Sequence, residues 1–163
     1  EIKNYTQGRN MIEKDDILNA QKNWADAIIK IGSLKQDRKA CEEETLKSID
    51  TLYAFGSHNV LFKPTKASSI PFRLNKEGAK SYFIGGDKNF PEDSGFALRP
   101  WTNIRFENAS VVIEGNKAYA MGHYYFKNGQ NRVEKVEYTF GYFKDQEGKI
   151  KIDLHHSSIP FSP

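Results

Sequence analysis

Residues 132–143, RVEKVEYTFGYF, form the stretch that decides the fold. From residue 136 onward every second side chain is apolar or aromatic, whereas the side chains between them are mostly polar. The first set is Val136, Tyr138, Phe140 and Tyr142, and the second is Lys135, Glu137 and Thr139. This alternation predicts a β-strand with one dry face and one wetter face, so other elements must cover the dry side.

Three similar segments accompany this strand, at residues 104–113, 118–126 and 150–158. Gly-Asn, Asn-Gly and Glu-Gly pairs separate the four segments, and such pairs are typical of tight turns. Four successive strands joined by hairpins form an antiparallel meander.

The first third of the chain has helical periodicity instead. Apolar residues recur at helical spacing from Asp15 to Ile31, and a second helix is predicted to begin after Asp37 and to stop at Gly56. Because helices come first and strands follow, the chain is predicted to be an α+β protein, with its N-terminal helices packed on a curved antiparallel sheet that forms a cone with one open mouth.

The connection between helices and meander is less regular. Residues 60–65 are predicted to be extended, and residues 66–103 to be irregular except for a small helix around residues 76–81.

Composition narrows the functional classes. The 163 residues carry a formal charge of +3, and their basic and acidic side chains are interspersed, which argues against a nucleic-acid partner. Cys41 is the only cysteine, so an internal disulfide and a multi-thiolate zinc site are excluded. No run approaches the roughly 18 apolar residues of a membrane span.

The last predicted strand ends in polar residues. Residues 149–160 read KIKIDLHHSSIP, with Ile150, Ile152 and Leu154 at alternate positions. Strict two-residue periodicity then places His156 and Ser158 on the same buried face. Unpaired polar groups there would cost on the order of 1–3 kcal/mol each, so the fold or a ligand must supply partners.

Two familiar kinds of site are disfavoured. His156 and Ser158 would run parallel about 7 Å apart, and no GxSxG elbow is present, so a serine hydrolase is not expected. His58, His123 and His156 could meet through folding, but no HxH or HExxH spacing supports a metal site. We therefore predict neither a metal nor another cofactor.

A binding site built from hydroxyl-bearing side chains is a third possibility. The candidates are Thr65, Tyr82, Tyr124, Tyr125 and Ser158. Hydroxyls both donate and accept hydrogen bonds without carrying a full charge, so together they could hold a small neutral or anionic substrate inside an apolar cone.

Six separated segments resemble the iota-class carbonic anhydrases. They are VLFKPTKA (60–67), SYFIGG (81–86), DSGFALRPW (93–101), AMGHYYF (120–126), VEYTFGYFK (136–144) and IDLHHSSIPF (152–161). The resemblance spans roughly residues 14 to 161 and implies a nuclear transport factor 2-like cone, related to the association domain of calmodulin-dependent protein kinase II and to SnoaL-like enzymes. It divides the chain into an N-terminal extension, residues 1–13, and a single domain, residues 14–163.

This resemblance implies metal-free, reversible hydration of carbon dioxide to bicarbonate. The family's threonine, tyrosine and serine carry over to Thr65, Tyr82 and a serine of HHSS, and Ser158 is chosen over Ser157 because it shares the predicted apolar face. His156 becomes a candidate proton acceptor. Tyr124 and, more weakly, His123 are further candidates for contact with the substrate. The resemblance also implies a homodimer, and a plastid location in an alga or a bacterial cell otherwise.

Two other functions stay open from the residues alone. Cones of this type can be non-catalytic oligomerisation or small-ligand-binding modules. An isomerase or cyclase would need a carboxylate base inside the cone, but Glu137 is predicted on the polar face and Asp153 opposite His156.

Overall fold

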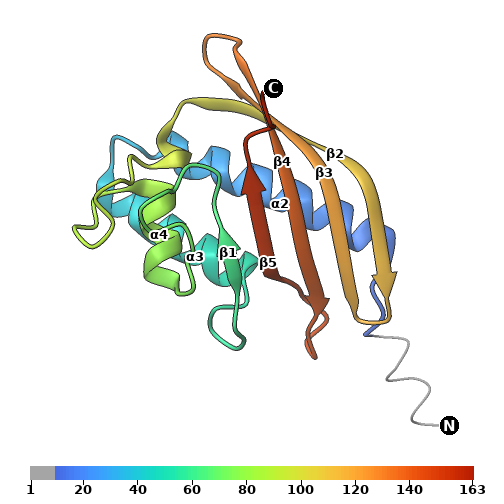
Figure 1. The fold of residues 1–163 in the computed structure, drawn as a ribbon. Helices are drawn as coiled ribbons and strands as arrows, with labels where there is room; N and C mark the ends of the chain where they lie inside the picture. The colour runs from blue at the N-terminus through green and yellow to red at the C-terminus, as the bar shows by residue number, and fades with distance from the viewer. Residues whose placement is uncertain (1–9) are drawn as a thin grey trace, which may run out of the picture.

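The computed structural model describes residues 10–163 (Figure 1). These residues form three helices, a 3-10 turn and five strands. The helical elements are α2 (Lys14–Ser33), α3 (Arg38–Leu52), α4 (Lys76–Ile84) and η1 (Phe96–Leu98). The strands are β1 (Leu61–Lys63), β2 (Trp101–Glu114), β3 (Lys117–Asn128), β4 (Val133–Lys144) and β5 (Ile150–Ser158).

The strands form one sheet in the order β1-β5-β4-β3-β2. The antiparallel meander from β2 to β5 is confirmed, and the short β1 adds a parallel edge beside β5. The predicted α+β class and the helices-then-sheet order are also confirmed. The pairing of β1 with β5 matters for function because it brings the segment after β1 to the C-terminal end of the chain.

The two long helices begin where the sequence provides caps. Glu13 and Asp16 form a capping box at the start of α2, and Asp37 accepts a hydrogen bond from the Ala40 amide at the start of α3. The α3 helix ends at Leu52 rather than at Gly56, because Tyr53 turns into extended backbone and bridges Ile152.

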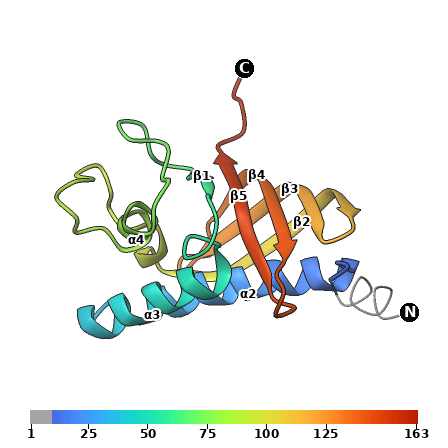
Figure 2. The ribbon, with the colours of Figure 1, turned by 90° about the horizontal axis from the view of Figure 1, so that it is seen from below.

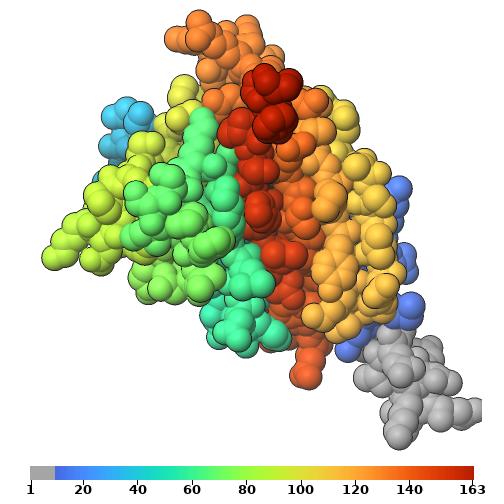
Figure 3. All heavy atoms as spheres, in the orientation of Figure 1, coloured from blue at the N-terminus to red at the C-terminus, as the bar shows by residue number. Residues whose placement is uncertain are grey.

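Both long helices lie on one side of the sheet (Figure 2). The buried side of α2 includes Ile17, Trp24 and Ile28, and it packs on the face of the sheet that carries Tyr138 and Phe140. Figure 3 shows strands β3, β4 and β5 at the molecular surface on the opposite side. The sheet therefore has a buried inner face and an outer face that none of the described helices covers.

A β-bulge in β5 reverses the predicted facing of its last residues. Gly141 pairs with Leu154, whereas the next residue, Tyr142, pairs with Ile152, so Asp153 is an extra residue on β5. Beyond this bulge His155 and Ser157 face the core and His156 faces out. The prediction that His156 and Ser158 share the buried face is therefore wrong by one residue.

Gly141 makes this bulge possible. A Cβ atom at position 141 would lie 2.8 Å from the Leu154 Cβ and 2.8 Å from Asp153 Oδ1, which is closer than carbon side chains tolerate. A glycine in the middle of an otherwise bulky strand thus sets the facing of residues more than ten positions later.

A buried ion pair fixes the irregular connection. Arg73 donates two 2.7 Å hydrogen bonds to the two carboxylate oxygens of Asp93, and neither side chain is exposed. Ser81 of α4 donates a third bond to Asp93. Since Tyr82 follows Ser81 directly, this pair also holds the tyrosine in place.

None of the helices within residues 10–163 is both long and apolar enough to cross a membrane.

Candidate active site

Hydroxyl groups from three distant parts of the chain meet at the end of the inner sheet face. Thr65, just after β1, lies 2.6 Å from Ser157 on β5, measured between the two hydroxyl oxygens. Ser157 also bonds to the Tyr124 hydroxyl of β3. Tyr124 and Ser157 are each 1% exposed, so this contact is fully shielded from bulk water.

Tyr82 joins these groups from α4. Its hydroxyl oxygen accepts a 3.2 Å hydrogen bond from the Lys66 amide, next to Thr65. Burial raises the pKa of Tyr82, and the Lys66 amide and the Thr65 side chain oppose this rise only in part. Tyr82 is therefore a protonated phenol at neutral pH and can donate its hydrogen. We call Thr65, Tyr82, Tyr124 and Ser157 the hydroxyl cluster.

His155 lies directly behind the hydroxyl cluster. Its ring stacks between Phe62 and Phe140, with centroid separations of 4.8 and 4.0 Å. Burial among these rings lowers the pKa of His155 well below its usual value, so the imidazole is neutral. Its Nε2 lies 3.2 Å from the Tyr124 hydroxyl, and its Nδ1 lies 2.7 Å from the Tyr53 hydroxyl.

The series of hydrogen-bonded side chains that includes His155 ends in the helical layer. Trp24 of α2 donates its indole N–H to the Tyr53 hydroxyl at 3.0 Å. Six side chains thus form one continuous hydrogen-bonded line through an apolar core, namely Trp24, Tyr53, His155, Tyr124, Ser157 and Thr65. No buried side-chain nitrogen or oxygen of the described residues lacks a partner.

A cavity of about 20 Å³ adjoins Tyr82, and this is room for roughly one water molecule. Lys66 and Arg99 also line it, and both form ion pairs with Glu134, at 3.1 and 3.5 Å. The cavity beside Tyr82 is thus lined partly by charged side chains, whereas the hydroxyl cluster is neutral.

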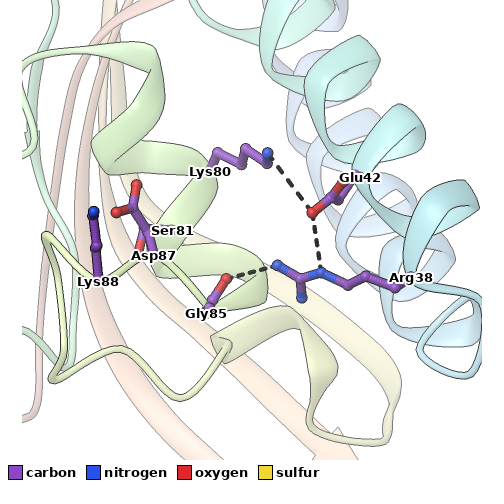
Figure 4. Close-up of a pocket in the computed structure, with 8 residues that line it drawn as sticks. Arg38, Glu42, Lys80, Ser81, Gly85, Asp87 and Lys88 are labelled. Atoms are coloured by element: carbon purple, nitrogen blue, oxygen red, sulfur yellow. Dashed lines mark hydrogen bonds and ion pairs between the residues drawn. The ribbon is translucent and has the colours of Figure 1, made fainter.

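A larger cleft of about 270 Å³ lies between α3 and α4 (Figure 4). Arg38 crosses it and donates to the carbonyl oxygens of Ile84 and Gly85, which closes the C-terminal end of α4. No residue of the hydroxyl cluster lines this cleft, and its hydrogen bonds serve to join the two helices.

The structure brings together some of the predicted site residues and separates others. Thr65, Tyr82 and Tyr124 lie in the hydroxyl cluster. Ser158 is half-buried on the outer side of β5, and His156 is exposed there, because of the bulge at Asp153.

His123 is also separated from the hydroxyl cluster. It lies on the outer face, where its Nε2 is 3.3 Å from a carboxylate oxygen of Glu137. Tyr125, from the wider hydroxyl set, stacks under Arg105, with the guanidinium 4.3 Å from its ring centroid. Neither residue contacts the hydroxyl cluster.

Four residues of this line were not predicted: Trp24, Tyr53, His155 and Ser157. For His155 and Ser157 the signal was present, since they are the first members of the HH and SS pairs, and Gly141 was the clue to the bulge. Trp24 and Tyr53 gave no such signal, because their spacing is that of ordinary core residues.

Within residues 10–163, no group of three or more histidine, cysteine or acidic side chains is arranged to hold a metal ion.

The solved structures that resemble this chain first define its fold class. A putative calmodulin-dependent kinase II association domain from Xanthomonas campestris has a TM-score of 0.58 at 20% identity, covering 93% of this chain and 91% of that one. A nuclear transport factor 2-like protein from Pseudomonas putida has a TM-score of 0.57 at 16% identity, covering 91% of this chain and 87% of that one. At these identities the likeness concerns the fold alone, which is the nuclear transport factor 2-like α+β cone.

Closer relatives narrow the class to a family. Residues 15–159 match the metal-independent carbonic anhydrase family. A metal-independent carbonic anhydrase from Nostoc sp. is 39% identical over 153 residues, which cover 92% of this chain and 75% of that protein. The crystal structure of a cyanobacterial iota-carbonic anhydrase complexed with bicarbonate has a TM-score of 0.91 at 38% identity, covering 94% of this chain and 95% of that one. The chain belongs to the metal-independent carbonic anhydrase family.

Proposed function

We propose that this protein interconverts carbon dioxide and bicarbonate at the hydroxyl cluster. Family membership assigns the reaction, CO₂ + H₂O giving HCO₃⁻ + H⁺. The observation that supports this location is the meeting of Thr65, Ser157 and Tyr124 beside Tyr82, in a core otherwise built from aromatic and aliphatic side chains. The similar cyanobacterial structure was solved with bicarbonate, which is an anion of the size that a few hydroxyls can hold.

Neutral donors suit this substrate pair. As water attacks the carbon of carbon dioxide, negative charge grows on the oxygens, and fixed hydroxyl donors in a water-poor site stabilise it. Tyr82 and Thr65 are the two cluster members that adjoin the Lys66 amide, so they are placed to donate to the bicarbonate oxygens.

The phenols of the cluster are donors and not bases. Burial raises the pKa of both Tyr82 and Tyr124, so neither gives up its proton at neutral pH. His156, the predicted proton acceptor, lies on the other side of the sheet. We therefore propose that the proton leaves on water by way of the cavity beside Tyr82, which Lys66 and Arg99 also line.

Stopped-flow hydration with an indicator dye tests the proposal. The protein should accelerate hydration after exhaustive chelation, and Thr65→Val should remove most of the acceleration because it deletes a donor while keeping the shape. Thr102→Val is the matched control, since Thr102 is exposed and bonds only to backbone carbonyls of β3. Absence of acceleration in the wild type, or full activity in Thr65→Val, would contradict the proposal.

We further propose that the protein is a homodimer joined through the outer sheet face. One row of outward residues crosses all five strands in register, formed by Val112, Tyr119, Gly141, Leu154 and Leu61. Val112, Tyr119 and Leu61 are 49%, 44% and 61% exposed, so this apolar band is open at its two ends, whereas Gly141 in its middle is buried against Asp153 and Leu154. A second copy could cover this band by an isologous contact.

Sedimentation velocity tests the dimer. Tyr119→Lys should shift the protein to monomers because it places a charge within the apolar band. Leu18→Lys is the control, since Leu18 is a similarly exposed apolar residue on α2. A wild type that sediments as a monomer at micromolar concentration would rule out this interface.

A further inference from the structure

The hydrogen-bonded line behind the site has a direction, by which we mean which atom of each pair donates the hydrogen. This direction follows from counting the hydrogens that each group has to donate. Trp24 marks its deep end, because the indole nitrogen can only donate. Its one hydrogen goes to the Tyr53 hydroxyl oxygen, 3.0 Å away. At the start of the line the roles of donor and acceptor are therefore fixed by covalent chemistry.

The Tyr53 hydroxyl accepts from Trp24 and donates to the next group in the line. Its hydroxyl has one hydrogen, and the only other hydrogen-bonding group near it among residues 10–163 is His155 Nδ1, at 2.7 Å. If Nδ1 carried the imidazole proton, two hydrogens would point at the Tyr53 oxygen and the phenol hydrogen would be buried without an acceptor. Such a loss costs a full buried hydrogen bond, so Tyr53 donates and Nδ1 accepts.

The tautomer of His155 is then fixed. It is neutral, because it lies between Phe62 and Phe140, so its single proton sits on Nε2 and is donated to the Tyr124 hydroxyl. Tyr124 in turn donates to Ser157, and Ser157 donates to Thr65. The last hydrogen of the line, on Thr65, has no acceptor within it.

We propose that Tyr53 is a positioning residue that sets the direction of the hydrogen bonds from His155 to Thr65, and that Trp24 supports it by binding the Tyr53 hydroxyl without offering it an acceptor. All donors point from the core toward Thr65, so the free hydrogen at the end is presented to a bicarbonate oxygen. The same direction means that His155 Nε2 is already protonated. His155 thus cannot take a proton from the hydroxyl cluster, and it acts as a donor that polarises Tyr124. This inference rests on the proposed function for its catalytic consequence only.

Nitrogen-15 NMR of the histidine side chains tests the direction without any activity measurement. We expect His155 in the wild type to show a protonated, pyrrole-like Nε2 and an unprotonated, pyridine-like Nδ1, assigned by its loss in His155→Gln. A protonated Nδ1 in the wild type would overturn the proposal at once.

Tyr53→Phe tests the origin of the direction. Without the phenol, no member of the line donates to Nδ1, so the line can reverse and the His155 signals should move toward a mixture of both tautomers. We expect kcat/KM for hydration to fall roughly tenfold, the effect of weakening one hydrogen bond in the site.

Tyr138→Phe is the matched control. Tyr138 is also a buried tyrosine whose hydroxyl donates one hydrogen bond, but to Asn108 Oδ1 at 2.6 Å, outside the line. Both variants lose one buried hydroxyl, so both should lose stability, but only Tyr53→Phe should change the His155 tautomer. Trp24→Phe should leave the tautomer unchanged, because phenylalanine offers the Tyr53 hydrogen no acceptor in place of His155 Nδ1. An unchanged tautomer in Tyr53→Phe, or a changed tautomer with unchanged kcat/KM, would refute the positioning role. A wild type that is inactive but shows the expected tautomer would instead refute the proposed function.

Discussion

The two faces of β5 carry the same pair of residue types in opposite settings. His155 and Ser157 lie inside, where each of their side-chain polar atoms has a protein partner, whereas His156 and Ser158 lie outside on the open sheet face. The covalent chemistry of the two pairs is identical, and they are one residue apart. What makes one pair a candidate site is the aromatic shell and the line of donors behind it, and this difference can be tested directly.

The largest expected effect separates the two serines. Ser157→Ala removes a hydroxyl that bonds to both Thr65 and Tyr124, and we expect about a hundredfold loss of hydration rate, as for one donor of an oxyanion site. Ser158→Ala should keep full activity because its side chain points away from the cluster. Stopped-flow rates of the two variants decide between the faces, and the reverse result would assign the site to Ser158.

The bulge that separates the faces should be costly to disturb. Gly141→Ala would press a methyl group against Leu154 and Asp153 at 2.8 Å, so we expect a loss of about 1–3 kcal/mol in the free energy of unfolding. Gly56→Ala is the control, since nothing lies within 4 Å of its added methyl. Urea denaturation of both variants measures the difference, and equal stability would show that β5 can move at this point.

The fold was predictable from periodicity, but the facing of the site was not. The alternation in residues 132–143 and the helical stripe before it predicted the sheet, its buried side and the covering helices. The bulge at Asp153 depends instead on a close contact with Gly141 on a neighbouring strand, and local periodicity contains no such information. Because HHSS repeats each residue type, an error of one position selects the right chemistry at the wrong residues.

The roles of Trp24 and Tyr53 also could not be predicted from local sequence. The Trp24–Tyr53 and Tyr53–His155 hydrogen bonds join residues 29 and 102 positions apart. A tryptophan on the buried stripe of a helix is normally core, and only its contact with a distant tyrosine gives it a further role. Thr65, Tyr82 and Tyr124 were predictable because their hydroxyls and the family resemblance marked them independently of facing.

A smaller effect should distinguish inner from outer tyrosines. Tyr82→Phe removes the phenol next to Thr65, and we expect roughly a tenfold loss in kcat/KM for hydration with the fold retained. Tyr125→Phe, one ring on the outer face, should be neutral for catalysis. Circular dichroism confirms folding of both variants, and a Tyr82→Phe variant with wild-type kcat/KM would remove this phenol from the mechanism.

The smallest effect concerns the two histidines and pH. Burial holds the pKa of folded His155 well below 6.5, whereas in the unfolded chain it takes its ordinary value near 6.5. Below pH 6.5 the unfolded state therefore binds a proton that the folded state does not, so His155 contributes a loss of stability as pH falls from 6.5 toward the folded pKa, and none above. The slope from this one group is at most about 1.4 kcal/mol per pH unit. His155→Gln should reduce the slope measured by urea denaturation between pH 7 and 5, whereas His156→Gln, on the exposed face, is the control that should keep it. A slope carried by His156 instead would mean that the outer histidine, and not the inner one, is the group whose environment changes on folding.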